Sequence, residues 1–532
     1  MATRRPDEKK LRPDRVSTSC IRDVVVMAFI PLVLDRVAGF VGVAVFSVPL
    51  MFTVAASLCA ELFWERPCHR IVRILLQSEK YEDAAVYRRK LSAVAFLAGV
   101  LFALSMVWVY PFLFGDTASR AGSRWIMLIA LPGIAFTAAS GAPRGYLRAR
   151  GADAGLAISR AMFRVLMLIL PCILGIIGMR YGKKVDALLM TDRYASVYSA
   201  VGAMAGMSLA AIAVWIELAA VTFVFRTSGI PSPGKTRGRN YSYFSSEGFV
   251  PLLLLILYGA DMRVFFSYSM PAEGEDLLSG WGRWFGIGYA PMLLVSGLVL
   301  LPFVIYVYRV HARCGREDYP SARGKLAGMV RHVMILSLPA AAFVCALAVP
   351  VVSILAGKPD DAGTICLRLQ MIGVPFAVFA VLFALLLSKI GGMRAVWVSV
   401  LIGTAVHAVV LILMGRAGKG VYACITARLT GIAATTLLLA FLLSAMLSYR
   451  QELIHGFAVP FICTAVAAAP MAALGAALPG VIGEVLTVIF LAVPGGILYL
   501  ILLSVFRGLA EYELYKLPGG GALVTLSRIF GR

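Results

Sequence analysis

Residues 141–166 read GAPRGYLRARGADAGLAISRAMFRVL and lie between two long apolar runs. The stretch concentrates five arginines, Arg144, Arg148, Arg150, Arg160 and Arg164, in surroundings that carry almost no charge. A basic, glycine-containing turn between apolar runs is typical of a loop that joins two membrane-spanning helices. The stretch therefore indicates an all-α chain that crosses a membrane.

The composition of the whole chain supports this interpretation. Hydrophobic residues make up 60% and charged residues 15% of the 532 residues, and a water-exposed surface would need more polar side chains. We therefore predict a polytopic membrane protein. Its first 22 residues are polar and charged, with no short apolar core before a small-residue cleavage site, so we expect no removable signal peptide.

Several other classes of protein do not fit the sequence. The nine cysteines occur singly without CxxC spacing and the five histidines are dispersed, so we predict no metal site, no cofactor and no Cys/His nucleophile. The net charge of +22 fits basic loops facing an anionic leaflet of the lipid bilayer, not a nucleic acid, because no soluble basic face with aromatics is present. No GxxxxGK[ST] loop indicates ATP as the energy source.

Apolar runs of about 20 residues mark the expected membrane helices. Fourteen runs fit, at 24–41, 43–63, 92–114, 124–142, 154–178, 196–225, 247–270, 285–308, 332–356, 365–388, 395–415, 420–447, 457–479 and 485–506. The first two are open to two interpretations, a tight hairpin or one long helix, because Asp35 and Arg36 lie in the middle of a short span.

Loop charge favours the hairpin. Cytoplasmic loops carry an excess of Lys and Arg, and with fourteen crossings most of these residues fall on the side of the N-terminus. A single helix would put the basic N-terminus and the basic segment 65–90 on opposite faces. We therefore expect a multi-pass protein of the plasma membrane with both termini cytoplasmic.

The chain also contains a weak internal repeat. Residues 386–413, LLSKIGGMRAVWVSVLIGTAVHAVVLIL, again show a helix, a basic turn with glycine and a second helix, at the same place in a second set of six helices. We therefore predict two pseudo-symmetric six-helix lobes plus two C-terminal helices. The expected domains are an N-lobe at 1–226, a C-lobe at 227–448, and helices 13 and 14 with a cytoplasmic tail at 449–532.

The opening stretch resembles a signature of the multidrug/oligosaccharidyl-lipid/polysaccharide (MOP) flippase superfamily, and within it the stage V sporulation protein B type. The matching residues are Arg144, Gly145, Tyr146, Gly151, Ala157, Ile158 and Ser159. Arg148 and Arg160 replace two glutamines of the signature, and Phe163-Arg164 replace its Glu-Gln pair. Residues 34–41, LDRVAGFV, resemble the first-helix motif of this family and of the lipid II flippases, with Arg36 as the motif's arginine.

The resemblance implies a flippase that moves a polyprenyl-diphosphate-linked glycan by alternating access, with cell-wall synthesis enzymes as further partners and no covalent step. Ionisable groups inside membrane segments are costly, so each is a functional candidate. These groups are Asp35, Arg36, Arg160, Arg164, Glu217, Asp261, Arg263, Arg368 and Arg428. Six arginines against three acids suit an anionic ligand, and arginine binds diphosphate through two parallel hydrogen bonds.

The residues that we expect to bind substrate are Arg36, Asp35, Arg160, Arg164, Asp261, Arg263 and Arg368. Arg160 and Arg164 share one helix face at i,i+4 and either extend a cationic path or snorkel to the interface. The signature turn, with Arg144, Gly145, Arg148 and Arg150, is expected to lie in the cytoplasm and contact lipid headgroups.

Three alternatives stay open at this point. A multidrug exporter of the same superfamily would move organic cations and should hold buried acids in excess. A membrane enzyme such as a glycan ligase would need a large outer loop with His, Asp or Arg, whereas the expected outer loops are short and contain no histidine. A transport-inactive scaffold for cell-wall enzymes is the third. The glycan and the coupling ion are not readable from the sequence.

Overall fold

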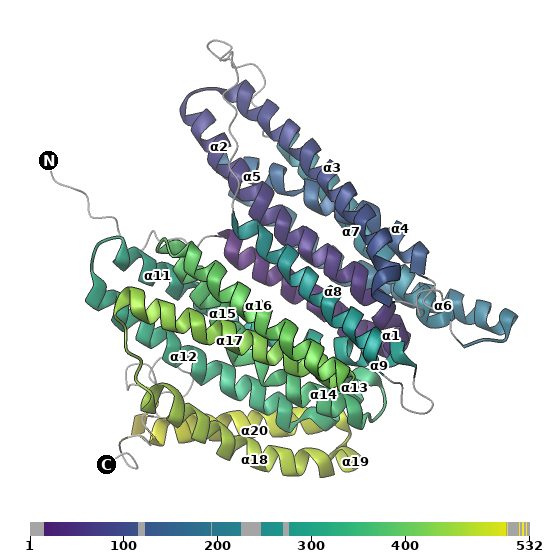
Figure 1. Ribbon diagram of the computed structural model, residues 1–532, viewed down its shortest axis with the longest axis vertical. Coiled ribbons are helices and arrows are strands. Elements are labelled where there is room, and N and C mark those ends of the chain that lie inside the picture. Colours follow the sequence, from purple (N-terminus) through teal and green to yellow (C-terminus); the bar gives the residue numbers. More distant parts are fainter. Residues whose placement is uncertain are drawn as a thin grey trace. The chain divides into compact units, whose positions relative to one another are not determined.

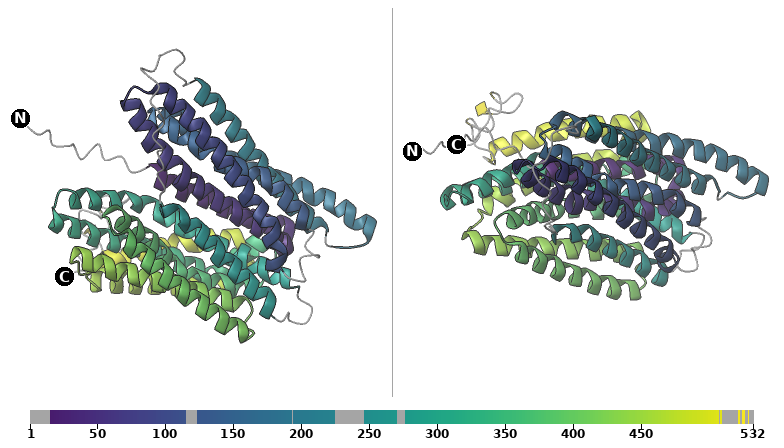
Figure 2. Two further views of the ribbon diagram at one scale, coloured as in Figure 1. Left: turned by 45° about the horizontal axis from the view of Figure 1, so that its top comes forward. Right: turned by 90° about the horizontal axis from the view of Figure 1, so that it is seen from above.

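A computed structural model describes residues 15–114, 123–192, 194–224, 246–269 and 276–506, with positions 508, 521, 524, 525 and 528. Within these residues every regular element is a helix (Figures 1 and 2). Thirteen helical runs among them are long and apolar enough to cross a membrane, by length and composition. The fold is therefore the all-α polytopic class that the sequence predicts.

The chain divides into two compact units, an N-terminal unit of Arg22–Gly286 and a C-terminal unit of Ile287–Arg532 with Met1–Ile21. The predicted three-part division at 226 and 448 stays a prediction. The helices up to the end of the N-terminal unit are α1 (Arg15–Cys59), η2 (Ala60–Glu65), α2 (Arg66–Gln77), α3 (Tyr81–Phe114), α4 (Ser123–Ala139), α5 (Gly141–Ala149), α6 (Asp153–Leu189), α7 (Tyr194–Val224), η4 (Ser246–Phe249), α8 (Val250–Tyr268) and α9 (Leu277–Arg283).

The main part of the C-terminal unit begins within the short π-helix η5 (Trp284–Tyr289). Its helices are α10 (Ala290–Leu300), η6 (Leu301–Phe303), α11 (Val304–Cys314), α12 (Tyr319–Ala346), α13 (Ala348–Ala356), α14 (Asp361–Met371), α15 (Gly373–Lys389), α16 (Met393–Arg416), α17 (Val421–Leu447), η7 (Ile454–Ala458), α18 (Val459–Ala477), α19 (Pro479–Ile482) and α20 (Glu484–Val505). Within this unit α18 packs against both α12 and α20 (Figure 1).

The first helical run reverses direction at Gly39. Asp23, near its start, and Glu65, near its end, bind Arg164 and Arg160, which are only four residues apart on α6. A straight helix from 23 to 65 would separate these acids by about 60 Å at 1.5 Å per residue. Gly39 is the residue of α1 with non-helical backbone angles, φ 67° and ψ 178°. The predicted hairpin is therefore confirmed, and its two limbs bring the thirteen runs to the predicted fourteen crossings.

We expect Gly39→Ala to destabilise the protein by about 1–3 kcal/mol, because its φ and ψ fall in a region that is essentially restricted to glycine. A Cβ at this position would meet no atom within 4 Å, so the cost comes from the backbone alone. The measurement is thermal unfolding of the purified protein. Gly324→Ala on α12, which also meets no atom within 4 Å, is the matched control. Equal melting temperatures for Gly39→Ala and wild type would contradict the assignment of the turn.

Small residues bring α6 and α7 into close backbone contact. A Cβ at Gly202 of α7 would lie 2.1 Å from the carbonyl oxygen of Leu174, and one at Gly178 of α6 would lie 2.2 Å from that of Tyr198. Helices in membranes use such small residues because apolar side chains gain little by leaving apolar lipid. This packing holds α6, which carries Arg160 and Arg164, in a fixed position.

Candidate functional site

The arginine turn, which we define as residues 141–166, consists of the short helix α5 and the first third or so of α6. Two glycines let α5 approach the end of the hairpin: a Cβ at Gly141 would lie 2.1 Å from the carbonyl oxygen of Ala60, and one at Gly145 2.5 Å from that of Glu65. The thiol of Cys68 donates to the carbonyl oxygen of Ala142 at 3.2 Å. The turn is therefore packed into the protein, with η2 directly against α5.

Ion pairs engage three of the five arginines. Arg160 donates from Nη2 to Oε1 of Glu65 at 2.7 Å, and Nη1 of Arg148 lies 3.7 Å from the same oxygen. Arg164 donates from Nε to Oδ1 of Asp23, also at 2.7 Å. Glu65 is 0% exposed and Arg160 is 7% exposed, so this pair is buried. The i,i+4 spacing of Arg160 and Arg164 thus places two charges beside two acids of the hairpin.

The remaining arginines of the turn contact aromatic rings. Arg144 is fully buried, with its guanidinium 5.2 Å from the centroid of Phe163. The ring of Tyr146 has Arg88 at 5.2 Å and Arg150 at 5.4 Å from its centroid. The expectation that Arg144 contacts lipid headgroups is therefore wrong. Residues 141–149 form the helix α5, which packs against η2, and the Arg144 side chain is buried in that packing.

The other predicted site residues lie in different parts of the two units. Asp35 is buried in the first limb of the hairpin, 3.4 Å from the position of a Cβ on Gly286, while Arg36 beside it is exposed. Asp261 is buried on α8. Arg263 donates to the carbonyl oxygen of Phe112 at 3.1 Å. Arg368 belongs to α14 of the C-terminal unit. Of the predicted residues, Arg160 and Arg164 lie four positions apart on α6 next to Glu65 and Asp23, and Arg148 of α5 lies near the same Glu65.

The expected excess of buried cations is not found among the described residues. The buried acids are Asp23, Asp35, Glu61, Glu65, Asp186 and Asp261, and the buried arginines are Arg144, Arg160 and Arg428. The sequence interpretation missed Asp23, Glu61 and Glu65 because they lie at the ends of apolar runs. A signal for two of them was present, since Glu61 and Glu65 are spaced i,i+4 like Arg160 and Arg164.

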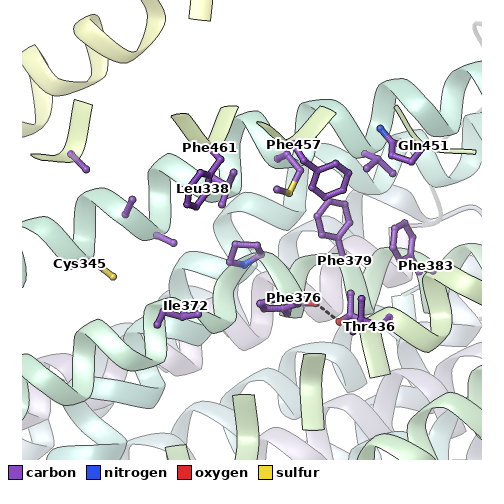
Figure 3. Close-up of a pocket in the computed structure, with 18 of the residues that line it drawn as sticks. Leu338, Cys345, Ile372, Phe376, Phe379, Phe383, Thr436, Gln451, Phe457 and Phe461 are labelled. Carbon is purple, nitrogen blue, oxygen red and sulfur yellow. Dashed lines mark hydrogen bonds between the residues drawn. The ribbon is translucent and has the colours of Figure 1, made fainter. Parts of the chain in front are cut away.

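The C-terminal unit contains an apolar groove of about 950 Å³, formed by α12, α14, α15, α17, η7 and α18 (Figure 3). Its lining is dominated by aliphatic side chains, alanines and phenylalanines. Phe379 and Phe457 point toward each other across it (Figure 3). Thr436 uses its hydroxyl to donate to the carbonyl oxygen of Phe376 at 2.9 Å. The groove can therefore hold a long apolar chain, because it presents few polar groups that need water.

The two ends of the groove differ in charge. Cys345 marks one end and Gln451 the other (Figure 3). At the first end, Arg368 donates from Nε to the carbonyl oxygen of Cys345 at 3.3 Å. At the second end the lining residues Tyr449 and Gln451 have polar side chains without a formal charge. The arrangement suits a molecule with an apolar chain and an anionic group.

The described ranges hold no group of three or more His, Cys, Asp or Glu side chains placed to bind a metal ion.

Comparison with known proteins gives no sequence match: no protein-family model and no curated protein matches the chain. Solved structures with a similar fold include the lipid II flippase MurJ in an inward closed conformation, at 15% identity and a TM-score of 0.61, covering 92% of this chain and 98% of that chain. An inward-facing MATE family multidrug resistance transporter of the MOP superfamily follows, at 12% identity and a TM-score of 0.54, covering 83% and 96%.

A MOP superfamily transporter from Pyrococcus furiosus, whose description notes a binding pocket of reverse polarity, matches at 15% identity and a TM-score of 0.51, covering 81% of this chain and 95% of that chain. The structural similarity establishes the fold, and identities this low leave the substrate open. The chain has the fold of the MurJ flippase and the MATE transporters, which is the fold of the MOP superfamily.

Proposed function

We propose that the protein is a flippase that moves a polyprenyl-diphosphate-linked glycan across the plasma membrane. The apolar groove of the C-terminal unit is the observation that carries this proposal. Its lining matches a polyprenyl chain, and Arg368 near one end supplies a cation for a diphosphate. The similarity to a structure described as a lipid II flippase supports the same class of substrate.

The proposed mechanism is alternating access without a covalent step. The lipid chain stays in the groove or the bilayer while protein groups replace the water around the diphosphate. Solved transporters of this fold include inward-facing and outward-facing conformations, which is what alternating access requires. Arg36, Asp35, Asp261 and Arg263 remain proposed substrate contacts, and the termini are proposed to be cytoplasmic. Membrane potential or an ion gradient is the proposed energy source.

Filling the groove tests the proposal. We expect Ala440→Trp to slow translocation of a fluorescent polyprenyl-diphosphate sugar in proteoliposomes at least tenfold, because Ala440 lines the groove and an indole would occupy the space of the chain. Ala445→Trp on the same helix, at an exposed position outside the groove, is the matched control. Unchanged translocation in Ala440→Trp, with normal thermal stability, would contradict the proposal.

A second candidate is an organic-cation antiporter of the same superfamily. The excess of buried acids favours it, with Asp35 and Asp261 fully buried within the N-terminal unit. Uptake of an organic cation such as ethidium into proteoliposomes separates the two candidates. Cation uptake that is lost in Asp35→Asn, together with no movement of the diphosphate lipid, would favour the antiporter.

A further inference from the structure

A second cavity, of about 700 Å³, lies in the N-terminal unit and is formed by α3, α4 and α7 with Pro143 of α5. It is separate from the groove, which belongs to the C-terminal unit. Three of the helices that form it are membrane-spanning by length and composition. The lining changes along the cavity from two arginines to a row of aromatic rings.

The basic end consists of Arg88 and Arg89, consecutive residues of α3. Arg88 donates from Nη1 to the hydroxyl of Thr222 on α7 at 2.6 Å, and its guanidinium lies over the ring of Tyr146. These two contacts hold Arg88 in one orientation between α3, α5 and α7. Arg89 is exposed at the mouth of the cavity. Two guanidinium groups at one opening form a site for an oxyanion such as a phosphate.

The other end is a row of three rings, one from each helix. Phe96 of α3 and Phe136 of α4 have ring centroids 5.2 Å apart, and Phe136 and Trp215 of α7 are also separated by 5.2 Å. Phe223 of α7 also lines the cavity, next to Thr222 at the end with the arginines, and is 72% exposed. This surface accepts an apolar chain and offers nothing to a small hydrophilic ion.

We propose that this cavity binds an anionic phospholipid of the bilayer, with its phosphate at Arg88 and Arg89 and an acyl chain along the aromatic row. A phospholipid is favoured over a soluble phosphate because the rings continue the cavity away from the arginines, on helices that are long and apolar enough to cross a membrane. The bound lipid would join α3, α4 and α7 and so stabilise the N-terminal unit. This inference does not depend on which substrate the protein transports.

The test measures binding of dioleoyl-phosphatidylglycerol to the purified full-length protein by native mass spectrometry. We expect Arg89→Gln to weaken the apparent Kd about tenfold, as loss of a charge-assisted contact to phosphate should. Lys90→Gln, an equal change of charge at the next, exposed residue outside the cavity, is the matched control and should change Kd less than twofold. Dioleoyl-phosphatidylcholine should bind at least tenfold more weakly than phosphatidylglycerol.

A steric pair of variants tests the apolar end. Ala93→Trp, in the lining, should also weaken binding about tenfold, whereas Val94→Trp, exposed and outside the lining, should not. Equal weakening by Arg89→Gln and Lys90→Gln would overturn the proposal by indicating a diffuse surface charge. Displacement of the lipid by millimolar glycerol phosphate would overturn it in favour of a soluble phosphate. Equal binding of both phospholipids would overturn it as well.

Discussion

Glu65→Leu should destabilise the N-terminal unit by about 3–5 kcal/mol, the typical result of removing one partner of a buried ion pair. The variant leaves Arg160, which is 7% exposed, without the carboxylate that it contacts at 2.7 Å. It also leaves Arg148 without the oxygen 3.7 Å away. Thermal unfolding in detergent measures the effect. Glu82→Leu, which removes an exposed carboxylate from the first turn of α3, should change stability by less than about 0.5 kcal/mol.

A double variant separates the pair from the packing around it. Glu65→Leu with Arg160→Met replaces both charges by apolar side chains of similar length, and such replacements are often neutral in buried pairs. We expect the double variant to be more stable than Glu65→Leu alone, with a coupling energy of about 1–3 kcal/mol. Additive losses in the two single variants would contradict a direct interaction.

Gly202→Ala should have an effect of comparable size, about 3–5 kcal/mol, and should reduce the yield of monodisperse protein. Its Cβ would lie 2.1 Å from the carbonyl oxygen of Leu174. That atom is backbone, so it cannot move aside without separating α6 from α7. Size-exclusion chromatography and thermal unfolding measure the effect.

The control for this prediction is Gly259→Ala on α8, in the same unit. Its Cβ would meet only the end of the Leu113 side chain at 3.4 Å, an ordinary contact. Equal thermal stability and yield of Gly202→Ala and Gly259→Ala would contradict the close contact between α6 and α7.

The fold could be predicted because long apolar runs and basic loops leave few ways to cross a bilayer. The distribution of Lys and Arg among the loops also favoured a hairpin, not one long helix, at residues 24–63. The position of its reversal was not readable: the sequence placed it near 42, and the backbone turns at Gly39. Two glycines, Gly39 and Gly42, lie in this region, and only the packing of the limbs determines which one turns the chain.

The candidate site was less predictable. Counting charges along the chain found Arg160 and Arg164 but missed Glu65, because pairing partners 95 residues apart in sequence are joined only by the tertiary fold. The groove could not be predicted from the sequence, for a different reason. Its phenylalanines, such as Phe379 and Phe457, have the same apolar character as residues that face lipid, so composition cannot distinguish the two surfaces.

The 95 residues between Glu65 and Arg160 also set an order of events during synthesis. At the usual rate of about 5–20 residues per second, the acid is made about 5–20 s before its arginine. During that interval Asp23 and Glu65 lack the two arginines of α6 that they bind in the folded protein. The base of the hairpin therefore reaches its final packing only after α6 has been made. Glu65 is thus synthesised before Arg160, and the packing of the hairpin is completed only when α6 packs against it.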